Sequence, residues 1–336
     1  MTKTLIIAEA GVNHNGSVDT ARRLIVAAKE AGADAIKFQT FSPDRMVSKS
    51  AVKADYQKRV GDPQESQYAM LKKLSLTLEQ HRLLLGFSRE TGIEFFSSAF
   101  DEPSADLLSE LGVPRFKISS GEITNLSLLD YIARKGKPAI LSTGMSSLGE
   151  VEQAVATIKN AGCKDLTLLH CTSNYPAEPQ NCNLRAILTL KSAFNLPVGY
   201  SDHTVGIEIP VAAVALGAVA IEKHLTLDKS LAGPDHLASA DPGEFKALVQ
   251  AIRNVESALG DGVKRIFPSE VHIRDVARKS LVVAADIPEG TVLNGKHIAI
   301  KRPGTGISPD LFSMLIGRRI KRNLKADDLF SLEDFE

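Results

Sequence analysis

The amino-acid sequence predicts an α/β protein: a (β/α)8 barrel of the TIM type followed by a small β-rich domain. The first observation is that short apolar runs rich in β-forming residues recur, each followed by a stretch with helical spacing. Strands that alternate with helices form parallel βαβ units, and eight such units favour a closed barrel. The predicted strands are Leu5–Ala10, Ala35–Phe41, Glu94–Phe100, Arg115–Gly121, Pro138–Gly144, Leu166–Cys171, Val198–His203 and Ala220–Leu225.

The competing fold is an open, doubly wound sheet. Such a sheet usually carries a glycine-rich G-x-G-x-x-G loop after its first strand. The corresponding segment here, Glu9–Gly16, reads EAGVNHNG and lacks that spacing. The barrel is therefore the predicted fold.

The second observation is a set of helix start and stop signals between the predicted strands. Ser17–Gly32 begins with a serine N-cap and ends at a glycine. Thr77–Gly92 and Ser147–Gly162 begin with capping-box patterns, because a Gln or Glu stands three residues after the cap. Asp241–Gly260 has its own aspartate cap and glycine stop. We expect His81, within the second of these helices, to lie on the helix surface.

The third observation is a change of pattern after Gly262. Residues 263–279 are charged and contain no strand-like runs, whereas residues 280–336 contain short β runs broken by Pro and Gly. We therefore expect a barrel over 1–262, a linker over 263–279 and a small β-rich domain over 280–336. A domain of fewer than about 60 residues buries little surface and should rest on the barrel or on another subunit.

The composition excludes several classes of protein. Lys and Arg number 40, Asp and Glu number 40, and the formal net charge is zero. That balance argues against a nucleic-acid-binding protein and against binding to an anionic membrane surface. No apolar run is long enough to span a membrane. Cys163, Cys171 and Cys182 show no CxxC spacing, so we expect a reducing cytoplasm rather than a disulfide framework.

Polar side chains gather at the predicted strand ends, which is where TIM-type barrels carry their chemistry. Residues two apart on a strand share a face, so Lys37 and Gln39 point the same way, as do Ser201 and His203. The long segment Ser42–Lys73 is expected to form a loop with a short helix over this mouth. The strand-end residues are Glu9, Lys37, Gln39, Ser98, Lys117, Ser120, Glu122, Ser201, His203, Glu222 and His224.

His203 and His224 end consecutive predicted strands, so their imidazoles can meet at the mouth of the barrel. Two neutral imidazoles suit a transition metal such as Mn, Zn or Co, with the remaining positions open to water and substrate. The alternative is that each histidine only forms hydrogen bonds in a polar pocket. The spacing leaves both interpretations open.

Lys37 and Lys117 are cations on otherwise apolar strands, where a buried ammonium group is costly unless it is paired. One interpretation is an anion site, in which both lysines and the hydroxyl groups of Ser98, Ser120 and Ser201 hold a phosphate and a carboxylate. Glu9 and Glu122 would then be general acid–base or water-orienting groups. The other interpretation is that each lysine forms a structural ion pair with Glu9, Glu122 or Glu222.

Nine motifs together resemble the bacterial sialic acid synthase family, which includes the synthases of N-acetylneuraminate, legionaminate and pseudaminate. The resemblance covers essentially the whole chain, in order. The motifs are AEAGVNHNG (8–16), KFQTF (37–41), FKISSGEITN (116–125), LSTGMSSL (141–148), LLHCTSNYP (168–176), GYSDHTVG (199–206), ALGAVAIEKHLTLD (215–228), GPDH (233–236) and KRPGTGI (301–307).

The resemblance implies a fold and a reaction. The fold is a barrel, a linker and a C-terminal antifreeze-like (SAF) domain. The reaction condenses phosphoenolpyruvate with an open-chain N-acetylmannosamine-type aldose and water, and gives a nonulosonic acid and phosphate. It implies that His203 and His224 bind a divalent metal, commonly Mn or Mg. The resemblance also implies that phosphoenolpyruvate is held by Lys37, Ser98, Lys117, Ser120, Ser173 and Ser201.

The remaining roles implied by the resemblance concern the sugar and the partner subunit. Glu9, Gln39 and Tyr175 would face the sugar, and Glu122 would orient the water that attacks C2, so Glu9, Glu122 and Lys117 are the predicted catalytic residues. In a domain-swapped homodimer, Arg302 would reach the sugar of the other subunit. Ser98, Ser173 and Gln64 depart from residues common in relatives, which puts the identity of the sugar in doubt more than the class of reaction.

Alternative functions remain open from the sequence. One is pseudaminate synthase or another phosphoenolpyruvate-dependent sugar-acid synthase, although synthases with phosphorylated sugar acceptors resemble barrels without the KRPGTG segment (301–306). The other is a non-enzymatic carbohydrate-binding module. Such a module would have no chemical use for the charged side chains at the strand ends, which are costly to bury without a ligand.

Overall fold

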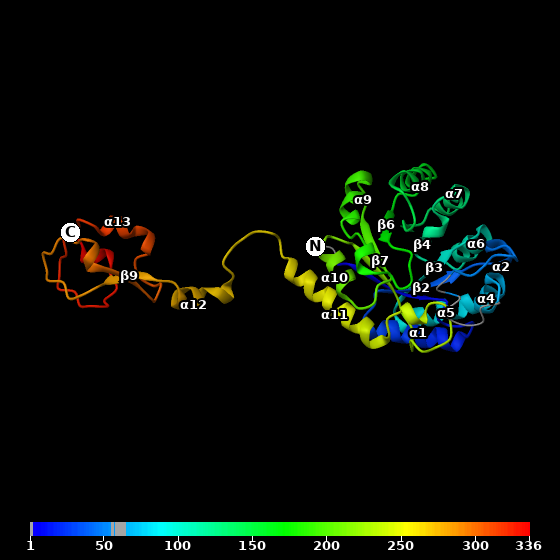
Figure 1. Cartoon of the computed structure of the whole chain (residues 1–336), viewed down its shortest axis with the longest axis horizontal. Coiled ribbons are helices and arrows are strands. Elements are labelled where there is room, and N and C mark those ends of the chain that lie inside the picture. The colour runs from blue at the N-terminus through cyan, green and yellow to red at the C-terminus, as the bar shows by residue number, and fades with distance from the viewer. Residues whose placement is uncertain (1–2, 55–56, 58–64) are drawn as a thin grey trace. The chain divides into compact units, whose positions relative to one another are not determined.

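The computed structural model describes residues 3–54, 57 and 65–336, so Gln64 lies outside the described residues. The chain divides into two compact units, Met1–Gly260 and Asp261–Glu336, which are described separately (Figure 1). No helix among the described residues is long and apolar enough to cross a bilayer.

The first unit is a closed barrel of eight parallel strands in sequential order, with helices around them (Figure 1). All eight predicted strands are present, which confirms the predicted fold class. The strands are β1 (Leu5–Gly11), β2 (Ala35–Thr40), β3 (Glu94–Ala99), β4 (Phe116–Ile118), β5 (Ala139–Ser142), β6 (Leu166–Cys171), β7 (Val198–Asp202) and β8 (Ala220–His224).

The predicted caps are present at the helix ends. Ser17 accepts a hydrogen bond from the Thr20 backbone at the start of α1, and Gly32 closes that helix in the left-handed conformation. Complete capping boxes open α5, α8 and α11. The helices are α1 (Val18–Ala31), α2 (Pro43–Met46), α4 (Gln67–Leu74), α5 (Leu78–Thr91), α6 (Glu102–Glu110), α7 (Leu126–Ala133), α8 (Leu148–Asn160), α9 (Ala186–Phe194), α10 (Glu208–Ala215) and α11 (Pro242–Leu259).

The interior of the barrel has an apolar layer beneath its polar mouth. Each residue of this buried layer lies two positions before a residue that lines the cavity described below, on the same strand. Because residues two apart share a face, the layer closes the barrel below the site. Its members are Ile7, Ala35, Phe96, Ile140, Leu169 and Ala220.

Two details differ from the sequence expectations. The fourth strand is shorter than predicted, because Ser120–Glu122 form a 3-10 helix, η1, directly after β4. The expectation that His81 lies on a helix surface is wrong: His81 is fully buried. It donates from Nδ1 to the Thr77 carbonyl at 2.9 Å and accepts at Nε2 from the Thr40 hydroxyl at 2.8 Å, so both ring nitrogens are satisfied.

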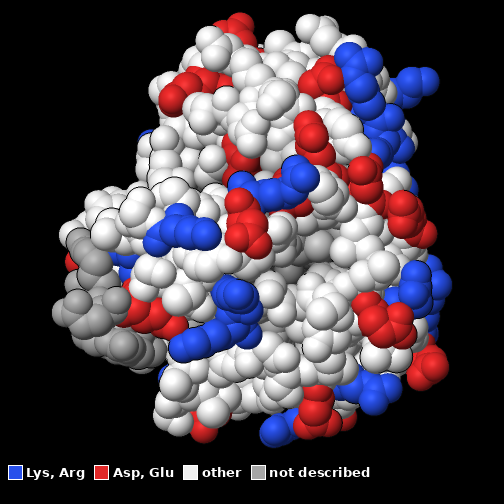
Figure 2. Space-filling model, turned by 90° about the vertical axis from the view of Figure 1, so that its right-hand side faces the viewer, with Lys and Arg blue, Asp and Glu red and all other residues white. Residues whose placement is uncertain are grey.

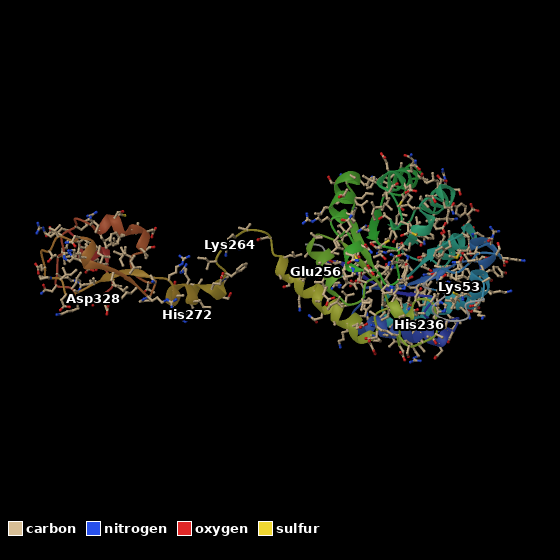
Figure 3. All side chains as sticks on the ribbon, in the orientation of Figure 1. Lys53, His236, Glu256, Lys264, His272 and Asp328 are labelled. Atoms are coloured by element: carbon tan, nitrogen blue, oxygen red, sulfur yellow. The ribbon has the colours of Figure 1, made fainter. Side chains whose placement is uncertain are left out.

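The second unit has its own small core and a two-stranded antiparallel sheet of β9 (Ser280–Val283) and β10 (Ile298–Lys301). The predicted linker contains helix α12 (Pro268–Ala277), on which His272 is exposed (Figure 3). A short helix, α13 (Phe312–Leu315), follows the sheet. Ten buried apolar residues, from Leu281 to Phe335, form the core of this unit.

Gly199 in β7 offers a test of barrel packing. A Cβ at this position would lie 2.6 Å from Leu169 Cδ2 and would also collide with the Ala220 carbonyl. We expect Gly199→Ala to lower the free energy of unfolding by about 1–3 kcal/mol, measured by urea denaturation. Gly149→Ala is the matched control, because nothing lies within 4 Å of its added Cβ. Equal stabilities of the two variants would contradict this packing.

Candidate active site

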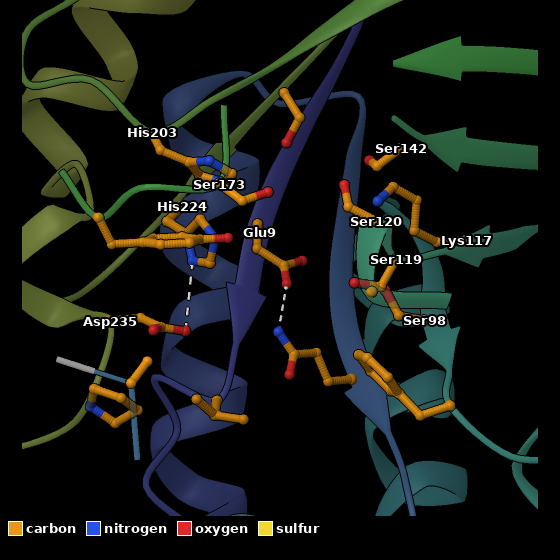
Figure 4. Close-up of a pocket in the computed structure, with 18 of the residues that line it drawn as sticks. Glu9, Ser98, Lys117, Ser119, Ser120, Ser142, Ser173, His203, His224 and Asp235 are labelled. Atoms are coloured by element: carbon orange, nitrogen blue, oxygen red, sulfur yellow. Dashed lines mark hydrogen bonds and ion pairs between the residues drawn. The ribbon is translucent and has the colours of Figure 1, made fainter. Parts of the chain in front are cut away.

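A cavity of about 410 Å³ lies at the C-terminal ends of the barrel strands. Every predicted site residue of the barrel lines it, and Figure 4 shows several of them pointing toward one another. Charged side chains of both signs are interspersed on the face of the molecule shown in Figure 2, in keeping with the balanced composition. The predicted residues in the cavity wall are Glu9, Lys37, Gln39, Ser98, Lys117, Ser120, Glu122, Ser173, Tyr175, Ser201, His203 and His224.

Two buried lysines face two buried glutamates across the barrel. Lys37 Nζ lies 2.6 Å from Glu9 Oε2 and 3.7 Å from Glu222 Oε2, and Lys117 Nζ lies 3.5 Å from Glu222 Oε1. Glu222 therefore lies between the two ammonium groups, as expected if the lysines form structural ion pairs with glutamates. The same lysines line the cavity, so they remain placed for an anionic ligand.

The pKa shifts show how this cluster shares its charge. Burial raises the pKa of Glu9 from 4.5 to about 7, although Lys37 opposes the shift. For Glu222, burial also raises the pKa, but the ammonium groups of Lys117 and Lys37 outweigh it and the pKa falls below its ordinary value. Burial lowers the pKa of Lys117. The cluster thus has one carboxylate firmly ionised and one that titrates near neutral pH.

Hydroxyl groups surround the two lysines. Lys37 donates to Ser98 Oγ at 3.1 Å, and Ser201 donates to Glu222 Oε1 at 3.1 Å. Ser120 Oγ accepts the Gly144 backbone N–H at 2.9 Å. Ser142, a polar residue at a predicted strand end to which the sequence assigned no role, also lines the cavity, and its buried hydroxyl has no hydrogen-bond partner among the described residues. Buried cations and free hydroxyl groups together suit a phosphate or carboxylate.

Three aromatic rings meet on the opposite side of the cavity. The ring centroids of His203 and His224 are 5.4 Å apart, and Tyr175 lies 4.1 Å from His203 and 5.6 Å from His224. His203 donates from Nδ1 to the Thr172 carbonyl at 2.7 Å, which leaves its Nε2 as the nitrogen with a lone pair. Burial lowers the pKa values of both histidines, so both are neutral at physiological pH.

Asp235 is a cavity residue that the sequence reasoning missed. Its Oδ2 lies 3.8 Å from His224 Nδ1, a buried nitrogen that has no hydrogen-bond partner in the part of the chain that the structure describes (Figure 4). Burial raises the pKa of Asp235 to about 6. The signal was available in the GPDH motif, since this loop follows β8 and loops after barrel strands line the mouth.

The other predicted residues occupy the rim and the second unit. Glu122 lies in η1 and accepts from Asn125 Nδ2 at 2.9 Å, while Gln39 donates to Glu9 Oε1 at 3.2 Å. Arg302 is not among the cavity residues of the barrel. It belongs to the second unit, where its Nε donates to the Ala277 carbonyl at 3.0 Å.

The raised pKa of Glu9 predicts a pH-dependent stability. The folded protein keeps the Glu9 proton up to about pH 7, whereas the unfolded chain releases it near pH 4.5. The folded state therefore binds one more proton between these two pH values. Proton binding by Glu9 stabilises the fold by up to about 3 kcal/mol at low pH, and this stabilisation is lost as the pH rises from about 4.5 to 7. Asp235 acts with the same sign. We expect Glu9→Gln to reduce the fall in unfolding free energy between pH 5 and 7.5. An exposed control, Glu152→Gln, should keep the wild-type slope, and an identical slope in both variants would contradict the assignment.

Comparison with known proteins decides the family. The model of the NeuB family matches residues 24–264. The chain belongs to the NeuB family. Residues 278–336 match the SAF domain, so the C-terminal unit of this NeuB-family chain is of the antifreeze-like type that the resemblance implied.

Relatives of this NeuB-family chain match along nearly its whole length. An N,N'-diacetyllegionaminic acid synthase of Legionella pneumophila is 51% identical over 98% of this chain and 94% of the relative. A protein of the same name from Campylobacter jejuni is 49% identical over 98% and 99%. A solved N-acetylneuraminic acid synthetase from Leptospira borgpetersenii, in complex with citrate, aligns with a TM-score of 0.71 at 39% identity, over 81% of this chain and 90% of that one.

Proposed function

We propose that this NeuB-family chain is a transferase that condenses phosphoenolpyruvate with an open-chain N-acetylmannosamine-type aldose and water. The products are a nonulosonic acid and phosphate. The observation that carries the proposal is the single cavity that joins two buried lysines and a set of hydroxyl groups to a pair of neutral histidines. The first set suits a small phosphorylated carboxylate, and the second suits a metal-assisted carbonyl reaction.

Phosphoenolpyruvate would bind at the lysine end of the cavity. Lys37 and Lys117 supply two positive charges, and the buried hydroxyl group of Ser142 donates to no other described residue. Because both ammonium groups are almost completely buried, their charge-assisted hydrogen bonds to the substrate would be strong. The residues proposed to hold the substrate are Lys37, Ser98, Lys117, Ser120, Ser173 and Ser201.

The reaction forms one bond between carbons and breaks one bond between carbon and oxygen. C3 of phosphoenolpyruvate attacks the aldehyde carbon of the sugar, water adds to C2, and the C2–O bond to phosphate breaks to leave a ketone. One proton of the water ends on the former aldehyde oxygen and the other on the departing phosphate. Glu122, partly exposed at the cavity rim, would orient that water and accept its proton. Glu9, Gln39 and Tyr175 would face the sugar, and Lys117 would stabilise the phosphate as it leaves.

The residues of the mouth fit a divalent metal such as Mn²⁺ or Mg²⁺. The fit rests on the neutral state of both histidines and on the buried His224 Nδ1, which no described residue meets with a hydrogen bond. Within the described residues, no three His, Cys, Asp or Glu side chains are grouped for a metal, so His203 and His224 would hold the ion together with water or substrate. Such an ion would polarise the aldehyde carbonyl.

The wall of the cavity favours a 6-deoxy acceptor. A buried apolar cluster of the mouth includes Val12, Met70 and Leu71, and these side chains line the cavity. Apolar walls favour a methyl group over a hydroxyl group, which would lose its hydrogen bonds to water. The relatives named N,N'-diacetyllegionaminic acid synthase agree with this choice, so we propose a diacetyllegionaminate-type product.

We propose that the active form is a domain-swapped homodimer in the cytoplasm. The loops of the mouth expose apolar side chains, Met145, Val205 and Leu237, that a partner subunit would cover. Arg302 of one subunit would then contact the sugar in the other. The three cysteines are free thiols, as in a reducing compartment.

Arg302→Ala tests the proposed partner contact. We expect the KM for the sugar to rise about tenfold or more, since a charged hydrogen bond to substrate is lost, while the KM for phosphoenolpyruvate stays within twofold. Arg322→Ala in the same unit is the control. Sedimentation should give a dimer for all three proteins. A monomeric and fully active wild type would contradict the proposal.

The reaction itself is tested by measuring phosphate release. We expect release only when phosphoenolpyruvate, the sugar and Mn²⁺ are all present, and we expect a chelator to stop it and added Mn²⁺ to restore it. Release without the sugar would identify a phosphatase instead. A rate that chelation leaves unchanged would exclude the metal from the proposal.

A further inference from the structure

A second charged pair lies behind the two histidines, outside the cavity. Lys223 Nζ contacts Asp202 Oδ2 at 2.5 Å, and both side chains are almost completely buried. Asp202 directly precedes His203, and Lys223 directly precedes His224. Because alternate residues of a strand point to opposite faces, the pair lies on the outer face of the barrel wall whose inner face carries the imidazoles.

A closed ring of hydrogen bonds joins Asp202, Thr204 and Lys223, so that it holds the residues before and after His203. Asp202 Oδ1 accepts from the Thr204 backbone N–H at 3.2 Å and from its hydroxyl at 2.8 Å. Lys223 also donates to the Thr204 carbonyl at 2.7 Å. The residues on both sides of His203 are therefore tied to the neighbouring strand through one ammonium group.

This ring lies where the pairing of β7 with β8 ends. Asp202 and Lys223 are the last residues paired between β7 and β8, and His203 follows the end of its strand, whereas His224 still pairs with Glu9 of β1. Apart from the ring, His203 is tied by its carbonyl to the Ala177 N–H at 2.8 Å and by its imidazole to Thr172. A buried ion pair is costly as a source of stability alone, whereas groups that orient the ligands of a metal are a known use of such contacts.

We propose that Asp202 and Lys223 are positioning residues that set the separation of the His203 and His224 imidazoles for one metal ion. The inference rests on the proposed metal role of the two histidines. It assigns a function to charges that contact neither substrate nor metal. Thr204 has the same positioning role through its two hydrogen bonds to Asp202.

The test compares metal binding in paired variants. Asp202→Asn with Lys223→Met leaves no buried charge and keeps an oxygen for Thr204, so the variant is designed to fold. We expect the dissociation constant for Mn²⁺, measured from the loss of the free-ion EPR signal without substrates, to rise about tenfold or more. Phosphoenolpyruvate binding measured by calorimetry without metal should change less than twofold, because Lys37 and Lys117 are untouched.

The matched control removes an ion pair elsewhere in the barrel. Asp34→Asn with Arg253→Met breaks a contact of 2.6 Å outside the cavity and should leave Mn²⁺ affinity unchanged. Thr204→Val is a milder change that should weaken Mn²⁺ binding about threefold. It replaces the Asp202→Asn, Lys223→Met variant as the test if that variant does not fold. Unchanged affinity in the Asp202 and Thr204 variants, or equal losses in the control, would overturn the inference. A wild type that does not bind Mn²⁺ would instead refute the proposed metal site, on which the inference depends.

Discussion

Lys117→Met should lower kcat/KM for phosphoenolpyruvate by about 100- to 1000-fold, because it removes a fully buried cation from the proposed anion site. The loss has two parts. The substrate loses a charge-assisted hydrogen bond, and Glu222 loses one of the two ammonium groups that hold its pKa below the ordinary value. The measurement is a steady-state assay with the sugar saturating.

Lys137→Met is the matched control for this variant. Lys137 lies two residues before β5, is outside the cavity and donates to the Val113 carbonyl, so kcat/KM should stay within twofold. If the Lys117 variant kept the wild-type value, the lysine pair would be a structural feature of the barrel, and phosphoenolpyruvate would have to bind elsewhere.

His203→Ala and His224→Ala should each lower kcat by about 1000-fold or more at saturating substrates, because each removes one of two imidazoles proposed to hold the metal. Stability should change less than activity, since the barrel core lies beneath these side chains. Circular dichroism checks the fold, and Mn²⁺ binding checks the cause. His272→Ala, an exposed change on α12, should behave as wild type. Retained activity in both cavity variants would remove the metal from the mechanism.

The sequence predicted the barrel well because its signals are local. Ser17 with Gly32, and Thr77 with its capping box, mark helix ends through contacts within a few residues. Once the strands were placed, the two-residue period put Lys37 and Gln39 in one cavity with Glu222 from the last strand of the barrel. The chemical roles of these residues depend on contacts between distant parts of the chain, and these roles remain proposals.

Features that depend on distant contacts were missed. Asp235 reaches the cavity on a loop held by Asn13, whose Nδ2 donates to the Leu225 carbonyl and to Ser239 Oγ, both at 2.9 Å. No local pattern encodes those contacts. His81 looked like a surface residue of a helix because its partner Thr40 lies on another element. The pairing of Asp202 with Lys223 likewise became visible only with the register of β7 against β8.

The central claim is that this NeuB-family chain joins phosphoenolpyruvate to a 6-deoxy diacetamido sugar. The most direct test incubates the full chain with phosphoenolpyruvate, Mn²⁺ and either N-acetylmannosamine or its 6-deoxy-4-acetamido analogue, and follows phosphate release and the mass of the acid formed. We expect one phosphate for each nine-carbon acid, and a kcat/KM about 10- to 200-fold higher with the analogue. A preference for N-acetylmannosamine would contradict the proposed acceptor, and no acid with either sugar would contradict the account.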